Sequence, residues 1–180
     1  SRSVMFPTVY FHPFSRGAEL MLARATKAAI LSGYFSYESF VSYTDHKFLS
    51  ELDSAGGISK NLVNDFENRK ITKRVVSITK DETENKGITK SDVEDLEISI
   101  SSKLGIDSSK IFMDLPPLKV MPDMKVKILK EDGSLDYASN MSTIIKSLYE
   151  AQFDHWRCRI YAPASLSEEA SKITKRELGL

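Results

Sequence analysis

The hydrophobic pattern changes its period near residue 70, and this change constrains the fold more than any other feature of the sequence. Between residues 14 and 31 apolar side chains recur every three or four positions, as on one face of a helix. Just after the change, KRVVSIT (73–79) is β-branched and alternates, which is typical of a strand. We therefore expect a helical part over residues 1–70 and a small α+β subdomain over residues 71–180.

Within the helical part, capping and helix-terminating residues predict where the helices begin and end. Thr44 or Asp45 is a suitable N-terminal cap for a helix that stops at the glycine pair 56–57. Another apolar face follows over residues 58–70. The segment before residue 13 contains Pro7 and Pro13, each without an amide donor, which predicts a kinked or broken helix there.

The second part alternates between strand and helix patterns. After 73–79 we expect a helix, a strand, a hairpin turning at Asp132-Gly133, a second helix and a last strand. This order is that of a βαββαβ, ferredoxin-like unit with an antiparallel sheet, closed by a C-terminal helix. The fold class predicted is α+β, and only DETENKG (81–87) reads as a polar surface loop. The elements expected after residue 79 are a helix at 90–105, a strand at 110–117, the hairpin at 124–137, a helix at 139–153, the last strand at 156–163 and the C-terminal helix at 165–178.

Composition excludes several classes of function. The 25 basic residues equal the 25 acidic ones, so no general positive charge argues for nucleic acid. No apolar run is long enough to span a membrane, so we expect no membrane partner and a cytoplasmic protein. The single cysteine, Cys158, sits in the strand-like RCRIY and is expected to be a buried small hydrophobe.

The residues that usually carry catalysis are sparse. A metal site needs three or four ligands brought together, whereas His12, His46 and His155 are dispersed without a metal-binding spacing. Glycine-rich phosphate loops and a nucleophile elbow are absent. The sequence therefore supports no catalytic residue and no metal ligand in this chain.

Two pairs of residues suggest binding chemistry. Arg2 and Tyr10 are eight residues apart, about two helical turns, so they would project from similar sides of a helix. Arg69 and Lys73 form a second pair, four residues apart. A guanidinium offers a planar fork for phosphate oxygens, and a tyrosine ring can stack on a sugar or base. Taken alone, each such residue is more often an ordinary surface charge than a ligand contact.

Three stretches carry a resemblance when they are taken together. They are RSVMFPTVYFHPFSRGAELML (2–22), YTDHKFLSEL (43–52) and FENRKITKRV (66–75). Their order and spacing resemble the C-terminal region of HD-domain phosphohydrolases such as the deoxynucleoside triphosphate triphosphohydrolases. The matching positions are Arg2, Tyr10, His12, Thr44, Asp45, Phe48, Leu49, Glu67, Arg69 and Lys73.

The resemblance implies a division of labour within a larger protein. A divalent metal, held by a helical part N-terminal to this chain, would activate water for attack on a phosphorus atom. This chain would supply one wall of a nucleotide pocket, with Arg2 on the triphosphate and Tyr10 on the sugar. His12, Arg69 and Lys73 would lie near an effector-nucleotide site at a subunit interface. The implied partners are a nucleotide, for which a dNTP is one candidate, the rest of the HD domain and further copies in a homo-oligomer.

A second hypothesis stays open. The chain could be a stand-alone ligand-binding or protein-interaction module without catalysis, its ferredoxin-like part being the functional face. Phe11 and Pro13 depart from the family pattern, so the resemblance predicts no particular base or sugar.

Overall fold

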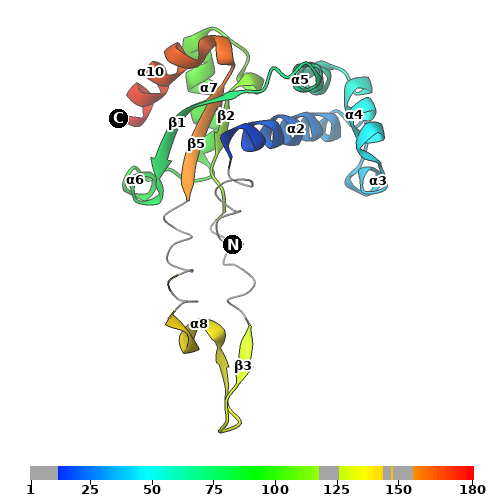
Figure 1. Cartoon of the computed structure of the whole chain (residues 1–180). Helices are drawn as coiled ribbons and strands as arrows, with labels where there is room; N and C mark the ends of the chain where they lie inside the picture. The colour runs from blue at the N-terminus through cyan, green and yellow to red at the C-terminus, as the bar shows by residue number, and fades with distance from the viewer. Residues whose placement is uncertain (1–11, 118–125, 144–146, 148–155) are drawn as a thin grey trace.

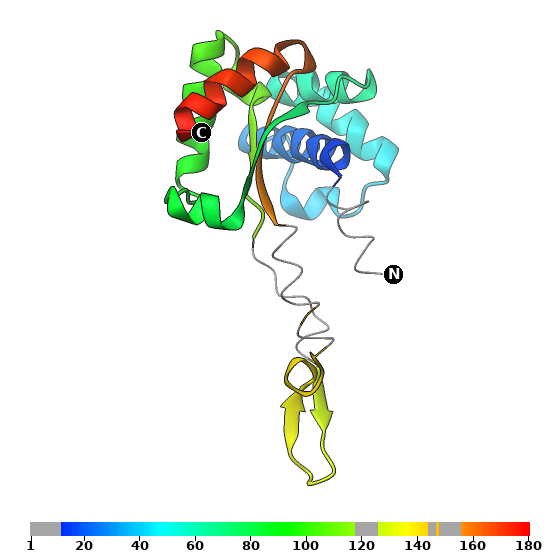
Figure 2. The same cartoon turned by 60° about the vertical axis from the view of Figure 1, so that its left-hand side comes forward.

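The computed structural model describes residues 12–117, 126–143, 147 and 156–180. A globular part holds most of the helices and a three-stranded sheet, and a small hairpin lies apart from it (Figures 1 and 2). The described elements, in chain order, are α2 (Pro13–Leu31), α3 (Tyr37–Phe40), α4 (Asp45–Ser54), α5 (Gly57–Glu67), β1 (Lys73–Thr79), α6 (Lys80–Asn85), α7 (Asp92–Leu104), η2 (Ser108–Lys110), β2 (Phe112–Asp114), β3 (Lys127–Leu129), β4 (Leu135–Tyr137), α8 (Ala138–Met141), β5 (Arg157–Ala162), η4 (Ala164–Leu166) and α10 (Ser167–Leu178).

The main sheet has the order β1-β5-β2, with β5 antiparallel to both neighbours. Successive side chains of a strand point to opposite faces, so each strand serves two layers. On β5, Cys158 and Ile160 belong to the core beneath α7 and α10, whereas Tyr161 belongs to the core beneath α2, α4 and α5. The sheet is therefore covered on both faces, and the views in Figures 1 and 2 agree with these three layers.

Helix α2 follows the predicted pattern closely. Its buried residues include Met21, Ala25 and Ala29, which are spaced by four residues as one helical face requires. His12 caps its N-terminus, and Pro13 stands at the first helical position, where its missing N–H costs nothing. Thr44, and not Asp45, caps α4 by accepting a hydrogen bond from the Lys47 N–H.

The α+β class, the small antiparallel sheet and the C-terminal helix are confirmed. One detail of the expected unit differs, because the hairpin β3–β4 forms a two-stranded sheet of its own beside the three-stranded sheet. The predicted helix at 139–153 falls largely outside the described residues, as does the expected kink before residue 13. The boundary expected at residue 70 stays a prediction.

The loop predicted at 81–87 is wrong, since residues Lys80–Asn85 form helix α6. The reason is a capping box. The Thr79 hydroxyl accepts from the Glu82 N–H, and the Glu82 carboxylate accepts from the Thr79 N–H at 2.7 Å. A polar composition hid this helix, because its stability comes from the satisfied N-terminal amides rather than from an apolar face.

Within the part of the chain that the structure describes, no helix is both long enough and apolar enough to cross a membrane.

Candidate functional site

A hollow of about 400 Å³ opens between helices α2 and α5, the start of β1, and the segments around η2 and η4. We call it the cationic groove. Its apolar lining comes from Met21, Leu62, Phe112 and Pro163, three of which also belong to the core above the sheet. The groove therefore has a rigid apolar floor built from four separate elements.

The polar lining of the cationic groove carries a surplus of positive charge. Lys70 and Lys110 enter from two segments far apart in the sequence, and Asp65 is the acidic residue of the lining. Among the described residues, neither lysine ammonium has a hydrogen-bond or ion-pair partner. Two exposed, unpaired cations above an apolar floor are suited to an anionic ligand that also has an apolar body.

Thr72 adds a polar group that has no partner. Thr72 is among the residues that line the groove, it is only 8% exposed, and its Oγ1 has no hydrogen-bond partner among the described residues. A buried hydroxyl without a partner is unfavourable by about 1–3 kcal/mol unless something binds it. Gly17 of α2 lies directly against it, since a Cβ at Gly17 would come within 3.1 Å of this oxygen.

Arg69 directly precedes the groove-lining segment 70–72 and has an uncommon backbone conformation. It follows helix α5 with a φ of 57°, the left-handed region, where glycine is the usual residue. The chain accepts a strain of roughly 1 kcal/mol in order to carry a guanidinium here. The Lys70 N–H closes the turn by donating to the Asp65 carbonyl at 2.8 Å, so both residues are held by the end of the same helix.

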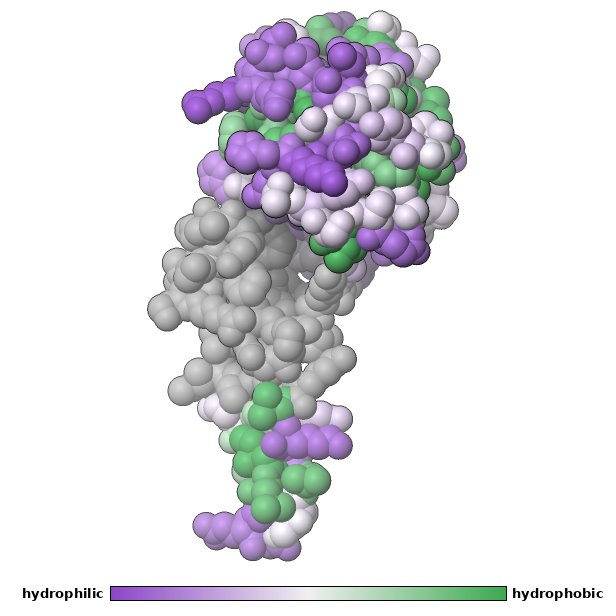
Figure 3. Space-filling model, turned by 90° about the vertical axis from the view of Figure 1, so that its right-hand side faces the viewer, coloured by the Kyte–Doolittle hydropathy of each residue, from purple (hydrophilic) through white to green (hydrophobic). Residues whose placement is uncertain are grey.

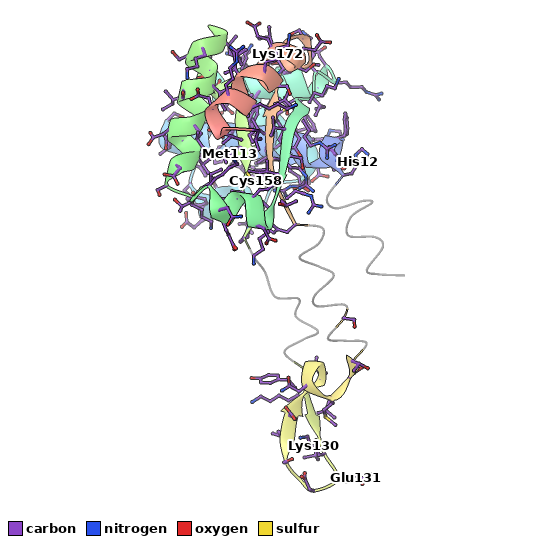
Figure 4. The ribbon with its side chains drawn as sticks, turned by 90° about the vertical axis from the view of Figure 1, so that its left-hand side faces the viewer. His12, Met113, Lys130, Glu131, Cys158 and Lys172 are labelled. Atoms are coloured by element: carbon purple, nitrogen blue, oxygen red, sulfur yellow. The ribbon has the colours of Figure 1, made fainter. Side chains whose placement is uncertain are left out.

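The structure separates the residues singled out from the sequence. Arg2 and Tyr10 lie outside the described residues. His12 is exposed, and its Nδ1 accepts a hydrogen bond from the Phe14 N–H at 3.3 Å (Figure 4). Arg69 and Lys73 are both exposed and flank the groove-lining segment 70–72, but neither side chain lines the groove itself.

Sequence reasoning missed Lys70, Lys110 and Thr72. The sequence signal for Lys70 was its position next to the candidate Arg69. Nothing in the sequence pointed to Lys110, because only the packing of η2 against the helical layer brings it across from Lys70.

A buried ion pair fixes the first turn of α2 to the sheet. Arg16 donates from Nη2 and Nε to the two carboxylate oxygens of Asp114, at 2.7 and 3.1 Å, and Asp114 is 3% exposed. These hydrogen bonds hold the pKa of the Arg16 guanidinium above its usual value. Arg159 Nη1 lies 3.7 Å from the same carboxylate, and burial lowers the pKa of Arg159. The first turn of α2 is thus held against β2.

A second ion pair covers the outer edge of β2. Glu97 of α7 accepts from the Met113 N–H at 2.7 Å, and Arg24 of α2 donates to the Ile111 carbonyl at 2.8 Å. The two side chains join at 2.6 Å, although they come from helices on opposite faces of the sheet. Burial raises the pKa of the Glu97 carboxyl, against the opposing effect of Arg24. The Met113 N–H and the Ile111 carbonyl of this edge are therefore satisfied by side chains, which hinders pairing with another strand.

The described residues do not fit a metal ion. No group of three or more His, Cys, Asp or Glu side chains among them lies close enough to hold one. Cys158 is buried as predicted, between Met113 and the other core residues beneath α10 (Figure 4). Burial raises the pKa of its thiol to about 12, which keeps it protonated and unreactive at neutral pH.

The fold and the groove together define an α+β unit in which a helical layer and a small sheet share a core, with a cationic hollow at their junction. A family model described as the HD associated region matches residues 1–180. The chain belongs to this family. No curated protein matches the chain.

Two solved structures share the fold. The first is a hypothetical protein from Aquifex aeolicus, with a TM-score of 0.61 and 21% identity, covering 96% of this chain and 42% of that one. The second is a phosphohydrolase from Bacteroides thetaiotaomicron, with a TM-score of 0.53 and 17% identity, covering 90% of this chain and 47% of that one. This chain therefore spans less than half the length of either neighbour.

Proposed function

We propose that this chain is the C-terminal part of a metal-dependent HD-superfamily phosphohydrolase, and that its cationic groove binds the phosphates of a nucleotide. The observation that carries the proposal is the groove itself, where Lys70 and Lys110 stand unpaired above a buried Thr72 hydroxyl that lacks a partner. Membership of the HD-associated family and the likeness to a phosphohydrolase support the assignment.

Charge and shape favour a nucleotide over a simple phosphate. The two ammonium groups, and the guanidinium of the neighbouring exposed Arg69, supply donors for phosphate oxygens. The apolar floor of Met21, Leu62 and Phe112 offers a surface for a base or sugar. Since Arg69 and Lys73 flank the lining segment 70–72, the groove is the proposed effector site, with His12 as a further candidate contact.

The substrate contacts belong to a different part of the chain. Arg2 and Tyr10 are the proposed ligands of the substrate phosphates and sugar, and Arg16–Asp114 holds the helix that follows them. The divalent metal is proposed to be held by a part of the protein outside this chain, because the described residues do not assemble a ligand set.

Calorimetric titration with ATP, GTP, the four dNTPs and inorganic triphosphate tests the groove. We expect the double variant Lys70→Ala/Lys110→Ala to bind the best nucleotide about tenfold more weakly, with the loss reduced at high salt. The matched control is Lys90→Ala/Lys172→Ala, which removes the same charge from exposed positions on the α7 and α10 side. Equal affinity in the two double variants would contradict the groove as the binding site.

A phosphohydrolase assay with Mg²⁺ or Mn²⁺ distinguishes this proposal from the stand-alone module. The chain alone is expected to release neither phosphate nor triphosphate from any nucleotide, whereas the longer protein that contains the metal-bearing part is expected to turn over. Turnover by this chain alone would refute the placement of the metal ligands. A longer protein that binds nucleotide but never hydrolyses it would favour the non-catalytic module.

A further inference from the structure

The hairpin β3–β4 exposes an apolar face. Leu129 and Leu135 are directly opposite each other in the ladder and are 68% and 63% exposed. Tyr137 lies on the same face, two residues along β4, and is also exposed. Figure 3 shows this hydrophobic surface along the hairpin, with hydrophilic side chains at its tip.

Such a hairpin lacks the contacts that usually stabilise one. A two-stranded ribbon is marginal in water, and a third strand or a packed face is normally required. Among the described residues, no strand pairs with the outer edge of β3. This contrasts with β2, whose outer edge is covered by Glu97 and Arg24.

The hydrogen-bond pattern shows which backbone groups this outer edge offers. The Lys130 N–H donates to the Ser134 carbonyl, and the Ala138 N–H donates to the Val126 carbonyl. In an antiparallel ladder these directions alternate, so Val126, Ile128 and Lys130 face β4. The backbone groups of Lys127 and Leu129 therefore point outward and are available to another strand.

Two copies of β3 can pair antiparallel about a two-fold axis in only some registers. Directly opposite residues must both point inward or both outward, which excludes an axis between Ile128 and Leu129. That register would also place Lys127 opposite Lys130 of the second copy, a like-charge pair. An axis through Leu129 satisfies the backbone rule, and it brings each Lys127 level with the turn residue Glu131 of the second copy, just beyond the end of β3.

The charges of the hairpin match this register. Lys130 already has an intrachain partner, since its Nζ lies 2.7 Å from the Asp136 carboxylate. Lys127 and Glu131 have no ion-pair partner among the described residues. The register centred on Leu129 would pair both of them and would join the leucines of the two hairpins in one row across four strands.

From these observations we propose that the outer edge of β3 is a homodimerisation surface, which pairs with β3 of a second copy of this chain about an axis at Leu129. The proposal is independent of the nucleotide site. It converts two marginal ribbons into one four-stranded antiparallel sheet.

Cysteine cross-linking of the 180-residue chain tests both the interface and its register. In the proposed pairing the two Leu129 Cα atoms are about 5.5 Å apart, which lies within disulfide range. Under mild oxidation Leu129→Cys should therefore give a covalent dimer on a non-reducing gel. The two Lys127 positions would be separated by four residues, about 13 Å along the strands. Lys127→Cys should therefore give no covalent dimer on the same gel. The native Cys158 is fully buried and does not compete.

Charge exchange supplies an independent readout by analytical ultracentrifugation. Lys127→Glu should weaken the dimer at least tenfold, and Lys127→Glu/Glu131→Lys should restore it. A covalent dimer from Ile128→Cys but not from Leu129→Cys would overturn the register. The interface would be overturned if the chain remained monomeric at 100 µM or above, a protein concentration roughly a hundred times a micromolar dissociation constant. A dimer insensitive to both charge variants would overturn it as well.

Discussion

At the scale of single residues, Asp114 is a buried charge in the sheet that depends on its arginine partners. Its carboxylate is 3% exposed and receives two hydrogen bonds from Arg16, with Arg159 nearby. A buried ion pair adds little net stability compared with an apolar pair, but removing one partner leaves the other charge buried without compensation. The position is therefore sensitive to substitution although it lies outside the cationic groove.

We predict that Asp114→Asn lowers the free energy of unfolding by about 3 kcal/mol, because two arginines lose their carboxylate. Urea unfolding followed by circular dichroism measures the change. Asp53→Asn is the control, since Asp53 forms an exposed pair with Lys60 at 3.7 Å and should change stability little. A loss below 1 kcal/mol for Asp114→Asn would show that the ion pair does not fasten α2 to the sheet.

Two buried acids predict the alkaline behaviour of the fold. Burial raises the pKa of both Cys158 and Tyr161 to about 12, whereas in an unfolded chain they titrate near 8.5 and 10. Above about pH 8.5 the unfolded chain loses protons that the folded chain keeps. Stability is therefore fully present below that pH and falls as the pH rises towards 12.

The cysteine contribution can be isolated by comparing the wild type with Cys158→Ala. Between pH 7 and 10.5 the wild type is expected to lose about 3 kcal/mol more stability than the variant. Parallel losses in the two proteins would mean that the thiol is not the titrating group. The same burial predicts that a disulfide reagent reacts with Cys158 only after unfolding.

At the scale of elements, helix α2 is the piece to which the others attach. It packs on α5, lies against the start of β1, and sends Arg16 and Arg24 to two different parts of the sheet. Its approach to β1 is closest at Gly17, where a Cβ would lie 2.9 Å from the Thr72 carbonyl oxygen. Only a residue without a Cβ allows this contact, because the neighbouring atom is backbone and cannot move aside.

We predict that Gly17→Ala destabilises the chain by roughly 1–3 kcal/mol through this overlap. In an unpacked helix the same change would stabilise by nearly 1 kcal/mol, so the sign of the effect reports on the contact. Thermal unfolding measures it, and Ala23→Gly on the exposed side of α2 supplies the propensity term alone. Stabilisation by Gly17→Ala would show that α2 and Thr72 are not in contact.

At the scale of the whole molecule, hydrogen bonds between strands and hydrophobic core contacts are distributed unevenly among the described parts. Strand β5 is hydrogen-bonded on both sides and contributes side chains to both cores. The hairpin β3–β4 shares no core with the globular part among the described residues, and both views show it apart from the sheet (Figures 1 and 2). Local opening should therefore be easy in the hairpin and rare in β5.

Hydrogen exchange should show this difference directly. At a concentration where the chain is monomeric, amides of β5 are expected to exchange only through global unfolding. Those of β3 and β4 are expected to exchange at least 100-fold faster, roughly the ratio that local opening produces. Comparable protection in β5 and the hairpin would contradict the picture of two independently opening parts.

The sequence by itself determined the elements whose signals are local. The apolar spacing of α2 and α7, a cap at Thr44 or Asp45 and the alternation of β1 and β5 each depend on neighbours within one or two turns, so pattern and element agree. Helix α6 was hidden because a capping box and not an apolar face stabilises it. Its signal, Thr79 followed by Glu82, was still local.

Only the tertiary structure decided which distant residues meet. Lys70 and Lys110 face one groove, and Glu97 and Arg24 close one strand edge, because layers packed on a shared sheet bring remote segments together. Nothing in the local sequence around a lysine records which other lysine will lie opposite it. The candidate site was therefore predictable as a neighbourhood, around Arg69 and Lys73, but not as a set of side chains. The separate hairpin has the same cause, since the ladder that a strand joins depends on packing energies summed over the whole chain.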